Sequence, residues 1–217
     1  MRPGARWQTV KRAIDFACAL LGAVALSPLL LVIALAVRLT SPGPVLFKQK
    51  RIGIHGSHFE MYKFRTMSAD TPPDVPTHLL AGPDKHVTRF GRLLRKASLD
   101  ELPQMFNILR GEMSIVGPRP ALWNQLDLIA ERERYGANDV RPGLTGWAQV
   151  NGRDELTIAE KATLDGYYVR NMGPVLDMKC IVASIAAVVK ADGVVEGAAP
   201  PAREHFDTTT GSEGRTQ

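Results

Sequence analysis

The stretch ACALLGAVALSPLLLVIALAV, residues Ala17–Val37 of the 217-residue chain, decides the fold. It contains no charged residue and, as a helix rising 1.5 Å per residue, is long enough for a hydrocarbon core of about 30 Å. Pro28 lies near its middle, removes the helix hydrogen bond to the Val24 carbonyl and crowds that turn, so we expect a sharp kink. Ser27 can return a hydrogen bond to the freed backbone.

Positive residues flank this run on both sides. Those before it are Arg2, Arg6, Lys11 and Arg12, and those after it are Arg38, Lys48, Lys50 and Arg51. Positively charged flanks favour the cytoplasmic side of a membrane. A helix that enters and leaves on one face satisfies both ends, so the residues favour a re-entrant, monotopic anchor over residues 1–40. A kinked spanning helix is the alternative. A signal peptide fits poorly, because the run is long and no small-residue cleavage site precedes a mature domain.

The charge of the chain points to anionic partners. The formal net charge is +5, and the residues from Ala191 onward are acidic overall. Phosphates, anionic lipid or nucleic acid would suit this charge. The membrane run and the lack of an aromatic stacking platform exclude nucleic acid as a good candidate. Two cysteines make no disulfide framework, and the five histidines show no zinc-ligand spacing.

The rest of the chain predicts a mainly α fold with a small β-hairpin, in the α+β class. Alternating apolar and polar residues in VLFKQKRIG and HFEMYKFRTM, on either side of IGIHGS, predict the hairpin. Periodicity and end signals predict helices over Val87–Lys96, Gln104–Arg110, Ala121–Tyr135, Thr157–Arg170 and Val175–Lys190. The last of these is apolar and is expected to lie on the membrane as an interfacial helix.

Three segments are expected to be irregular. SIVGPRP is predicted to be a turn, and VRPGLTGWAQVNGR a loop rich in Gly and Pro. Ser68–His86 is rich in Pro and Asp, which predicts a surface loop long enough to act as a lid. Residues 193–217 are small and polar, which predicts a disordered tail.

A second stretch, KASLDELPQMFNILRG (Lys96–Gly111), places the carboxylates Asp100 and Glu101 side by side. Ser98 and Glu101 match a capping box, but Pro103 would then be the fifth helical residue, at a cost of about 3 kcal/mol. With Asp100 as the cap, Pro103 falls where its missing N–H is not needed. We therefore expect the helix to begin at Asp100 or Glu101, with both carboxylates ionised by the helix end and by the basic residues before them.

These carboxylates fit a plain helix cap and also fit chemistry. Ionised carboxylates can attack phosphorus as nucleophiles, or hold Mg²⁺ together with substrate phosphates. Either role needs cations for the phosphate oxygens, and the chain offers Lys63, Arg65, Arg95, Arg119 and Arg141. Each of them taken alone fits a solvated surface charge better than a phosphate ligand, although Arg119 lies between prolines in a stiff turn.

Six stretches together resemble the bacterial sugar transferase family, the small monotopic phosphoglycosyl transferases that are also called polyprenyl-phosphate hexose-1-phosphate transferases. They are KRAIDF, LSPLLLVIALAVRLTSPGPVLFKQKRIG, YKFRTM, SLDELPQMFNILRGEMSIVGPRP, RPGLTGWAQVNGR and LDGYYVRNMGPVLDMK. They follow one another in order over about residues 10–190, which makes the resemblance specific. Larger relatives carry additional N-terminal spanning helices, so the chain resembles the minimal form.

The resemblance implies transfer of a sugar-1-phosphate from a UDP-sugar to undecaprenyl phosphate, with release of UMP. This is the first membrane step in the synthesis of surface polysaccharides, such as exopolysaccharide, or glycoconjugates. By the resemblance, Asp100 is the nucleophile that forms a covalent aspartyl-phosphosugar intermediate, and Glu101 binds Mg²⁺ together with Asp100. The implied substrate- and phosphate-binding residues are Lys63, Arg65, Arg95, Arg119, Arg141, Asp165 and Asp177. The family's re-entrant break falls on Ser27 and Pro28.

The resemblance also implies where the chain works. Residues 41–192 would form a catalytic domain on the cytoplasmic face of the bacterial inner membrane, in contact with lipid, and a homodimer would be compatible with this arrangement. A non-catalytic membrane-anchored adaptor of a glycan assembly complex is the alternative. A phosphatase with an aspartyl-phosphate intermediate is a third reading, but no base for its water is evident. The sequence does not identify the sugar or the glycan.

Overall fold

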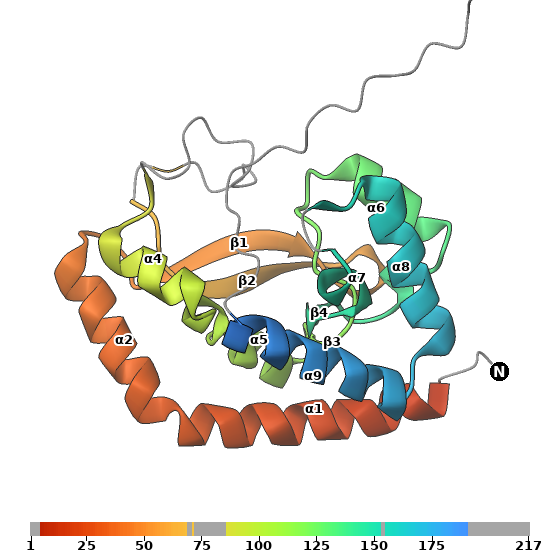
Figure 1. Cartoon of the computed structure of the whole chain (residues 1–217), viewed down its shortest axis with the longest axis horizontal. Coiled ribbons are helices and arrows are strands. Elements are labelled where there is room, and N and C mark those ends of the chain that lie inside the picture. The colour runs from red at the N-terminus through yellow and green to blue at the C-terminus, as the bar shows by residue number, and fades with distance from the viewer. Residues whose placement is uncertain (1–4, 69–70, 72–85, 153–154, 191–217) are drawn as a thin grey trace, which may run out of the picture.

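The computed structural model describes residues 5–68, 71, 86–152 and 155–190 of the chain. Helices dominate these residues and two small two-stranded sheets accompany them, which confirms the expected α+β class. The predicted loop Ser68–His86 falls almost entirely outside the described residues, and the predicted tail 193–217 does so completely. Figure 1 shows the two N-terminal helices as an L-shaped frame, with the other elements on its inner side.

The apolar run forms two helices, α1 (Ala5–Ala25) and α2 (Ser27–Thr40), with a bend of 64° between them. Pro28 has no N–H for the Val24 carbonyl, and Ser27 Oγ donates to that carbonyl at 2.8 Å instead. The predicted kink and the predicted role of Ser27 are therefore confirmed. Within the described residues, no helix taken alone is both long and apolar enough to cross a membrane, whereas the bent pair taken together meets both criteria.

Strands β1 (Leu46–Ile52) and β2 (His58–Phe64) form the predicted antiparallel hairpin. Apolar side chains of β2 join two buried clusters, one with α1 and one with α2. The clusters are Ala19, Phe59, Met61, Ile108 and Met113, and Ile33, Val37, Phe64 and Leu94. Burial of each large apolar side chain contributes roughly 1.5–3 kcal/mol. The hairpin therefore ties both arms of the bent helix pair to the rest of the fold.

Four further predicted helices are confirmed to within two residues at each end. They are α4 (Arg89–Lys96), α5 (Gln104–Arg110), α8 (Ile158–Asn171) and α9 (Pro174–Lys190). Side-chain caps begin two of them: at α4, Thr88 Oγ1 accepts from the Gly91 N–H, and at α8, Thr157 forms a capping box with Glu160. Gly111 ends α5 in the left-handed conformation, with φ 84°.

The prediction that SIVGPRP is only a turn was wrong, and so was the prediction that the segment around Gly143 is only a loop. Strand β3 (Ser114–Val116) pairs in parallel with β4 (Gly143–Thr145), and the short helix α7 (Trp147–Val150) follows. Glycines permit this close approach, because a Cβ on Gly143 would lie 2.1 Å from the Gly117 nitrogen. Pairing between segments so far apart in the chain leaves no signal in local periodicity.

The helix predicted over Ala121–Tyr135 is shorter in the structure, where α6 covers only Leu126–Glu133. The Ala121 carbonyl accepts from the Ile52 N–H at 3.0 Å, so the chain here extends along the end of β1 before it turns into a helix. The short 3₁₀ turn η4 (Ala137–Asp139) follows. This extended start places the preceding proline-rich turn beside the hairpin.

Candidate active site

Asp100 and Glu101 lie on η3 (Leu99–Glu101), a 3₁₀ turn between α4 and α5. Of the two starts that the sequence predicted for the next helix, Asp100 or Glu101 was therefore wrong, and Gln104 is confirmed. The regular helix α5 begins at Gln104. Pro103, whose φ is −62°, stands just before it, so no helix hydrogen bond needs the N–H that Pro103 lacks. Neither the 3₁₀ turn nor α5 has a side-chain hydrogen bond that caps its N-terminus. The plain helix-cap reading of Asp100 thus loses its structural basis.

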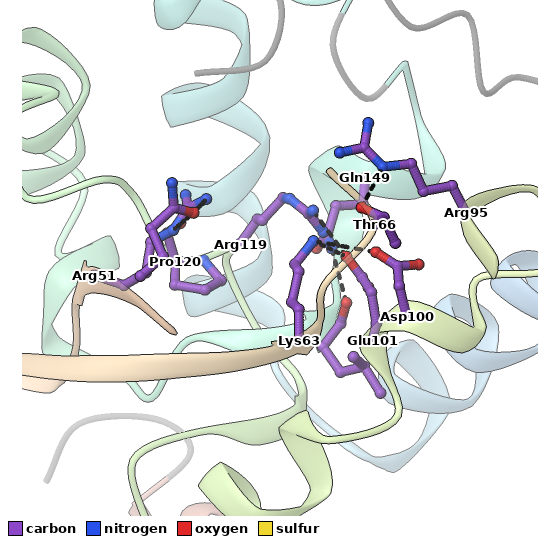
Figure 2. A network of polar contacts seen from close by, with 11 residues as sticks. Arg51, Lys63, Thr66, Arg95, Asp100, Glu101, Arg119, Pro120 and Gln149 are labelled. Atoms are coloured by element: carbon purple, nitrogen blue, oxygen red, sulfur yellow. Dashed lines mark hydrogen bonds and ion pairs between the residues drawn. The ribbon is translucent and has the colours of Figure 1, made fainter. Parts of the chain in front are cut away.

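Two cations from distant segments meet Glu101. Lys63 Nζ of β2 lies 2.7 Å from Glu101 Oε1 and 4.0 Å from Asp100 Oδ2. Arg119 Nη2, from the turn after β3, lies 3.0 Å from the same Glu101 oxygen. Figure 2 shows these four side chains as one group. Glu101 is therefore paired with two cations, whereas the ion pair of the buried Asp100 within the described part of the chain is the longer contact with Lys63.

The two neighbouring carboxylates have opposite pKa shifts. Burial raises the pKa of Asp100 above its ordinary value of 3.8, and the charges of Lys63 and Arg95 offset this only in part. Burial acts in the same direction on Glu101, but Lys63 and Arg119 outweigh it and hold the pKa of Glu101 below 4.5. The expectation that every effect favours ionisation was thus wrong for Asp100. Such a pair separates the two roles, because the more basic carboxylate is the better nucleophile.

Arg95 stands at the end of α4, and its Nε donates to Thr66 Oγ1 at 2.8 Å. In the view of Figure 2 its side chain lies above Asp100, while Arg119 lies beside Glu101. The structure therefore brings together five of the predicted residues: Lys63, Arg95, Asp100, Glu101 and Arg119. Three positive charges around two carboxylates leave an excess of positive charge for a phosphate.

Two arginines that the sequence did not single out brace the turn that carries Arg119. Arg132 Nη1 donates to the Arg119 carbonyl at 2.8 Å, and Arg51 Nη1 donates to the Pro120 carbonyl at 2.8 Å (Figure 2 shows Arg51 and Pro120). Burial and, to a lesser extent, the charge of Arg119 together lower the pKa of Arg51 to about 9. The two prolines of this turn were the one signal in the sequence for side chains that donate to its carbonyls, because a proline has no N–H that could do so.

Asp165 contacts Arg132 and lies away from the two carboxylates Asp100 and Glu101. It is 1% exposed, and its Oδ2 accepts from Arg132 Nε at 2.8 Å and lies 2.6 Å from Arg132 Nη2. Its other oxygen, Oδ1, is buried and has no hydrogen-bond partner in the described part of the chain. Asp165 is therefore connected to the turn that carries Arg119 through Arg132, which donates to the Arg119 carbonyl.

Asp177 also lies elsewhere, in a buried clasp that fastens α1 to the rest of the fold. Its Oδ2 lies 2.9 Å from Lys11 Nζ, and its Oδ1 accepts from the Tyr168 hydroxyl at 2.7 Å. Asp15, one turn along α1 from Lys11, accepts from Ser114 Oγ at 2.7 Å. This clasp accounts for Lys11 and Asp15 of KRAIDF, whereas Arg12 donates to the Ile108 and Leu109 carbonyls.

The two remaining predicted cations bond to backbone at other places. Arg141 Nε donates to the Gly111 carbonyl at the end of α5, at 2.9 Å. Arg65 Nη2 donates to the Ser41 carbonyl just after α2, at 2.7 Å. None of their hydrogen bonds reaches Asp100 or Glu101.

The residues around Asp100 fit a magnesium ion that is shared with a substrate. Among the described residues, no cluster of three or more His, Cys, Asp or Glu could hold a metal alone. Magnesium in phosphoryl-transfer sites commonly uses one or two carboxylates together with substrate phosphates and water. Asp100 and Glu101 supply two such carboxylates, and the ion pairs of Glu101 use only its Oε1.

The chain belongs to the bacterial sugar transferase family, whose model matches residues 6–191. It is 41% identical over 186 residues to the uncharacterized sugar transferase EpsL of Bacillus subtilis (strain 168), covering 85% of this chain and 90% of EpsL. It is 43% identical over 195 residues to the undecaprenyl-phosphate glucose phosphotransferase of Komagataeibacter xylinus, covering 85% of this chain but 37% of that protein. The UDP-glucose:undecaprenyl-phosphate glucose-1-phosphate transferase of Caulobacter vibrioides is 40% identical over 205 residues, covering 88% of this chain and 76% of the relative.

Neutralising Glu101 is expected to remove a pH-dependent part of the stability. Because its folded-state pKa is depressed, Glu101 contributes stability above its ordinary pKa of 4.5, and this contribution disappears as the pH falls toward the lower folded-state pKa. The melting temperature of wild type should therefore exceed that of Glu101→Gln at about pH 6, and this difference should shrink as the pH falls below 4.5. A difference that stays constant across this range would contradict the pairing of Glu101 with Lys63 and Arg119.

Proposed function

We propose that this chain transfers a sugar-1-phosphate from a UDP-sugar to undecaprenyl phosphate and releases UMP. One observation carries the proposal: a buried carboxylate with raised pKa, Asp100, stands beside Glu101, which two cations neutralise. Membership of the sugar transferase family and the activities for which two relatives are named support the same reaction. The proposed product is the first lipid-linked intermediate of a surface polysaccharide or glycoconjugate.

The proposed reaction has two displacements at the same phosphorus. An Asp100 oxygen attacks the β-phosphorus of the UDP-sugar, the bond from this phosphorus to the bridging oxygen breaks, and UMP leaves with that oxygen. The product is an acyl phosphate that carries the sugar. A phosphate oxygen of undecaprenyl phosphate then attacks the same phosphorus and releases the Asp100 carboxylate. Lys63, Arg95 and Arg119 supply positive charge for the phosphate oxygens in both steps.

A bound Mg²⁺ would be held by Asp100 and Glu101 and would neutralise charge on the diphosphate. The protein's own residues keep Glu101 ionised and oriented, through Lys63 and Arg119. They also keep Asp100 buried at low solvation, which preserves its basicity.

The bent pair of α1 and α2 is proposed to be a re-entrant anchor in the inner membrane, with the catalytic domain on the cytoplasmic face. Large apolar side chains are exposed along α1, α2 and α9. They include Val10, Ile14, Leu20, Leu21 and Val24, then Leu31, Val32, Leu35 and Leu39, and then Val175, Met178, Val182 and Ile185. An exposed apolar surface of this extent suits contact with lipid. The anchor would hold the site at the depth of the acceptor phosphate.

Removing the break should change the topology of the anchor. Pro28→Ala restores an N–H for the Val24 carbonyl, so we expect a straighter helix that spans the membrane in part of the molecules. Cysteines placed at Gly4 and Ser57, in a chain without Cys18 and Cys180, can be labelled from one side of sealed vesicles. In the parent both should react from the same side, and in Pro28→Ala a fraction should react from opposite sides. Ser27→Ala, which keeps the proline, is the control, and opposite sides in the parent would overturn the re-entrant anchor.

The test of the reaction is UMP release by the purified chain with Mg²⁺, undecaprenyl phosphate and a panel of UDP-sugars. We expect UMP from one or a few donors and a sugar phosphate on the lipid. UMP from none of the donors would overturn the transferase and favour the adaptor. Release of inorganic phosphate without any lipid acceptor would instead indicate the phosphatase.

A further inference from the structure

Arg65 is a buried cation whose hydrogen-bonding capacity is largely unused. It follows β2, its side chain is directed to the end of α2, and the residue is only 6% exposed. Nη2 donates to the Ser41 carbonyl, whereas Nε and Nη1 are buried and have no hydrogen-bond partner among the residues that the structure describes. A guanidinium is always charged and has five N–H donors. Most of the donors of Arg65 therefore lack an acceptor in the described residues.

This arrangement is costly unless another group supplies acceptors. A buried donor without a partner costs about 1–3 kcal/mol, and more when the group is charged. Arg65 also has no ion pair with a carboxylate among the described residues, unlike Arg132, which is buried with Asp165. A chain that needed only the backbone bond to Ser41 could make it with a smaller donor. The unused donors thus point to a ligand with several anionic oxygens.

A second cation, Arg38, lies within electrostatic reach of Arg65. Burial and, to a lesser extent, the charge of Arg38 lower the pKa of Arg65. Arg38 occupies the last turn of α2 and is exposed. The carbonyl end of a helix is equivalent to about half a negative charge, so one guanidinium would suffice to neutralise it. Two guanidinium groups leave a clear excess of positive charge.

We propose that Arg65 and Arg38 form a second phosphate site, which binds the phosphate headgroup of an anionic membrane lipid. The proposal rests on the proposed function only in taking α1 and α2 as the membrane anchor. The site then lies where the anchor leaves the hydrocarbon, which is the depth of the lipid phosphates. It is separate from the site at Asp100, because the Arg65 side chain bonds to Ser41 and makes no hydrogen bond with either catalytic carboxylate. A bound headgroup would fix the end of α2 against β2.

The test measures lipid binding by the full chain in neutral detergent with EDTA, so that no Mg²⁺ supports binding at Asp100. The probes are dihexanoyl phosphatidylglycerol, dihexanoyl phosphatidylcholine and inorganic phosphate, all at equal ionic strength. The melting temperature of the protein is measured as a function of the concentration of each probe. Phosphatidylglycerol should stabilise wild type at concentrations at which the other two do not. Arg65→Gln should weaken this binding roughly tenfold or more, because charge-assisted hydrogen bonds are lost.

Arg38→Gln and Arg92→Gln make the matched comparison. Both remove one exposed positive charge, from α2 and from the neighbouring α4 respectively. Arg38→Gln should weaken binding of phosphatidylglycerol about threefold, whereas Arg92→Gln should leave it unchanged. Arg38→Gln also keeps the proposal testable if Arg65→Gln does not fold.

Three results would overturn the proposal. Equal weakening by Arg38→Gln and Arg92→Gln would show only general attraction between charges. Equal stabilisation by inorganic phosphate would assign the site to a soluble anion instead of a lipid. Unchanged binding of phosphatidylglycerol by Arg65→Gln would show that Arg65 forms no such site. UMP release by the same wild-type preparation separates the two proposals, since its absence would overturn the transferase and leave the lipid measurement valid.

Discussion

Asp100→Asn is expected to abolish UMP release and to leave the fold intact. An amide has almost the same shape as a carboxylate but cannot act as a nucleophile on phosphorus, so the rate should fall by a factor on the order of 10³ or more. The folded protein should not be weakened. Because burial raises the folded-state pKa of Asp100, the ionised form is disfavoured in the fold, and this penalty is present at neutral pH. We therefore expect an equal or higher melting temperature for Asp100→Asn at pH 7.

The covalent intermediate gives the sharper readout. Wild type incubated with Mg²⁺ and a labelled UDP-sugar, but without undecaprenyl phosphate, should retain label on the protein, and hydroxylamine should release it as it does from acyl phosphates. Asp100→Asn should retain none. Asp127→Asn makes the same change at an exposed position on α6 and should behave as wild type. Equal UMP release by Asp100→Asn and wild type would return Asp100 to a structural role.

The sequence predicted those parts of the fold that short-range rules govern. The kink at Pro28, the hairpin, and the helices capped by Thr88 and Thr157 all follow from residues that are near one another in the chain. The parallel pairing of β3 with β4 was missed, because it joins segments that lie far apart in the chain and relies on the close approach of Gly117 and Gly143. Contacts of this kind depend on tertiary packing, which local propensity does not contain.

The candidate site was predicted in its composition but not in its electrostatics. Lys63, Arg95 and Arg119 do meet Asp100 and Glu101, as the pattern of cations suggested. The direction of the Asp100 pKa shift was wrong, because sequence spacing reports neighbouring charges and does not report burial. The bracing arginines were missed for a related reason, since their partners are backbone carbonyls that no side-chain motif marks.

Arg132→Met is expected to cause the largest loss of stability of any single change at the site. It leaves Asp165 as a buried charge without its partner, and breaking a buried ion pair in this way costs about 3–5 kcal/mol. For a chain of this size that corresponds to a drop in melting temperature of roughly 6–20 °C. Arg134→Met, at the residue that ends α6 and whose side chain is 74% exposed, should change the melting temperature very little.

The double variant Arg132→Met/Asp165→Leu separates stability from function. With both charges removed, an apolar pair fills the space, so most of the lost stability should return. Activity should not return with it, because the Arg119 carbonyl still lacks the donor that Arg132 supplies. We therefore expect a melting temperature near that of wild type, together with a raised KM for the UDP-sugar. A double variant no more stable than Arg132→Met would contradict the ion-pair argument, whereas full recovery of activity would show that Arg119 needs no brace. The two results together decide whether the Asp165–Arg132 pair serves the fold alone or also positions the cation that neutralises Glu101.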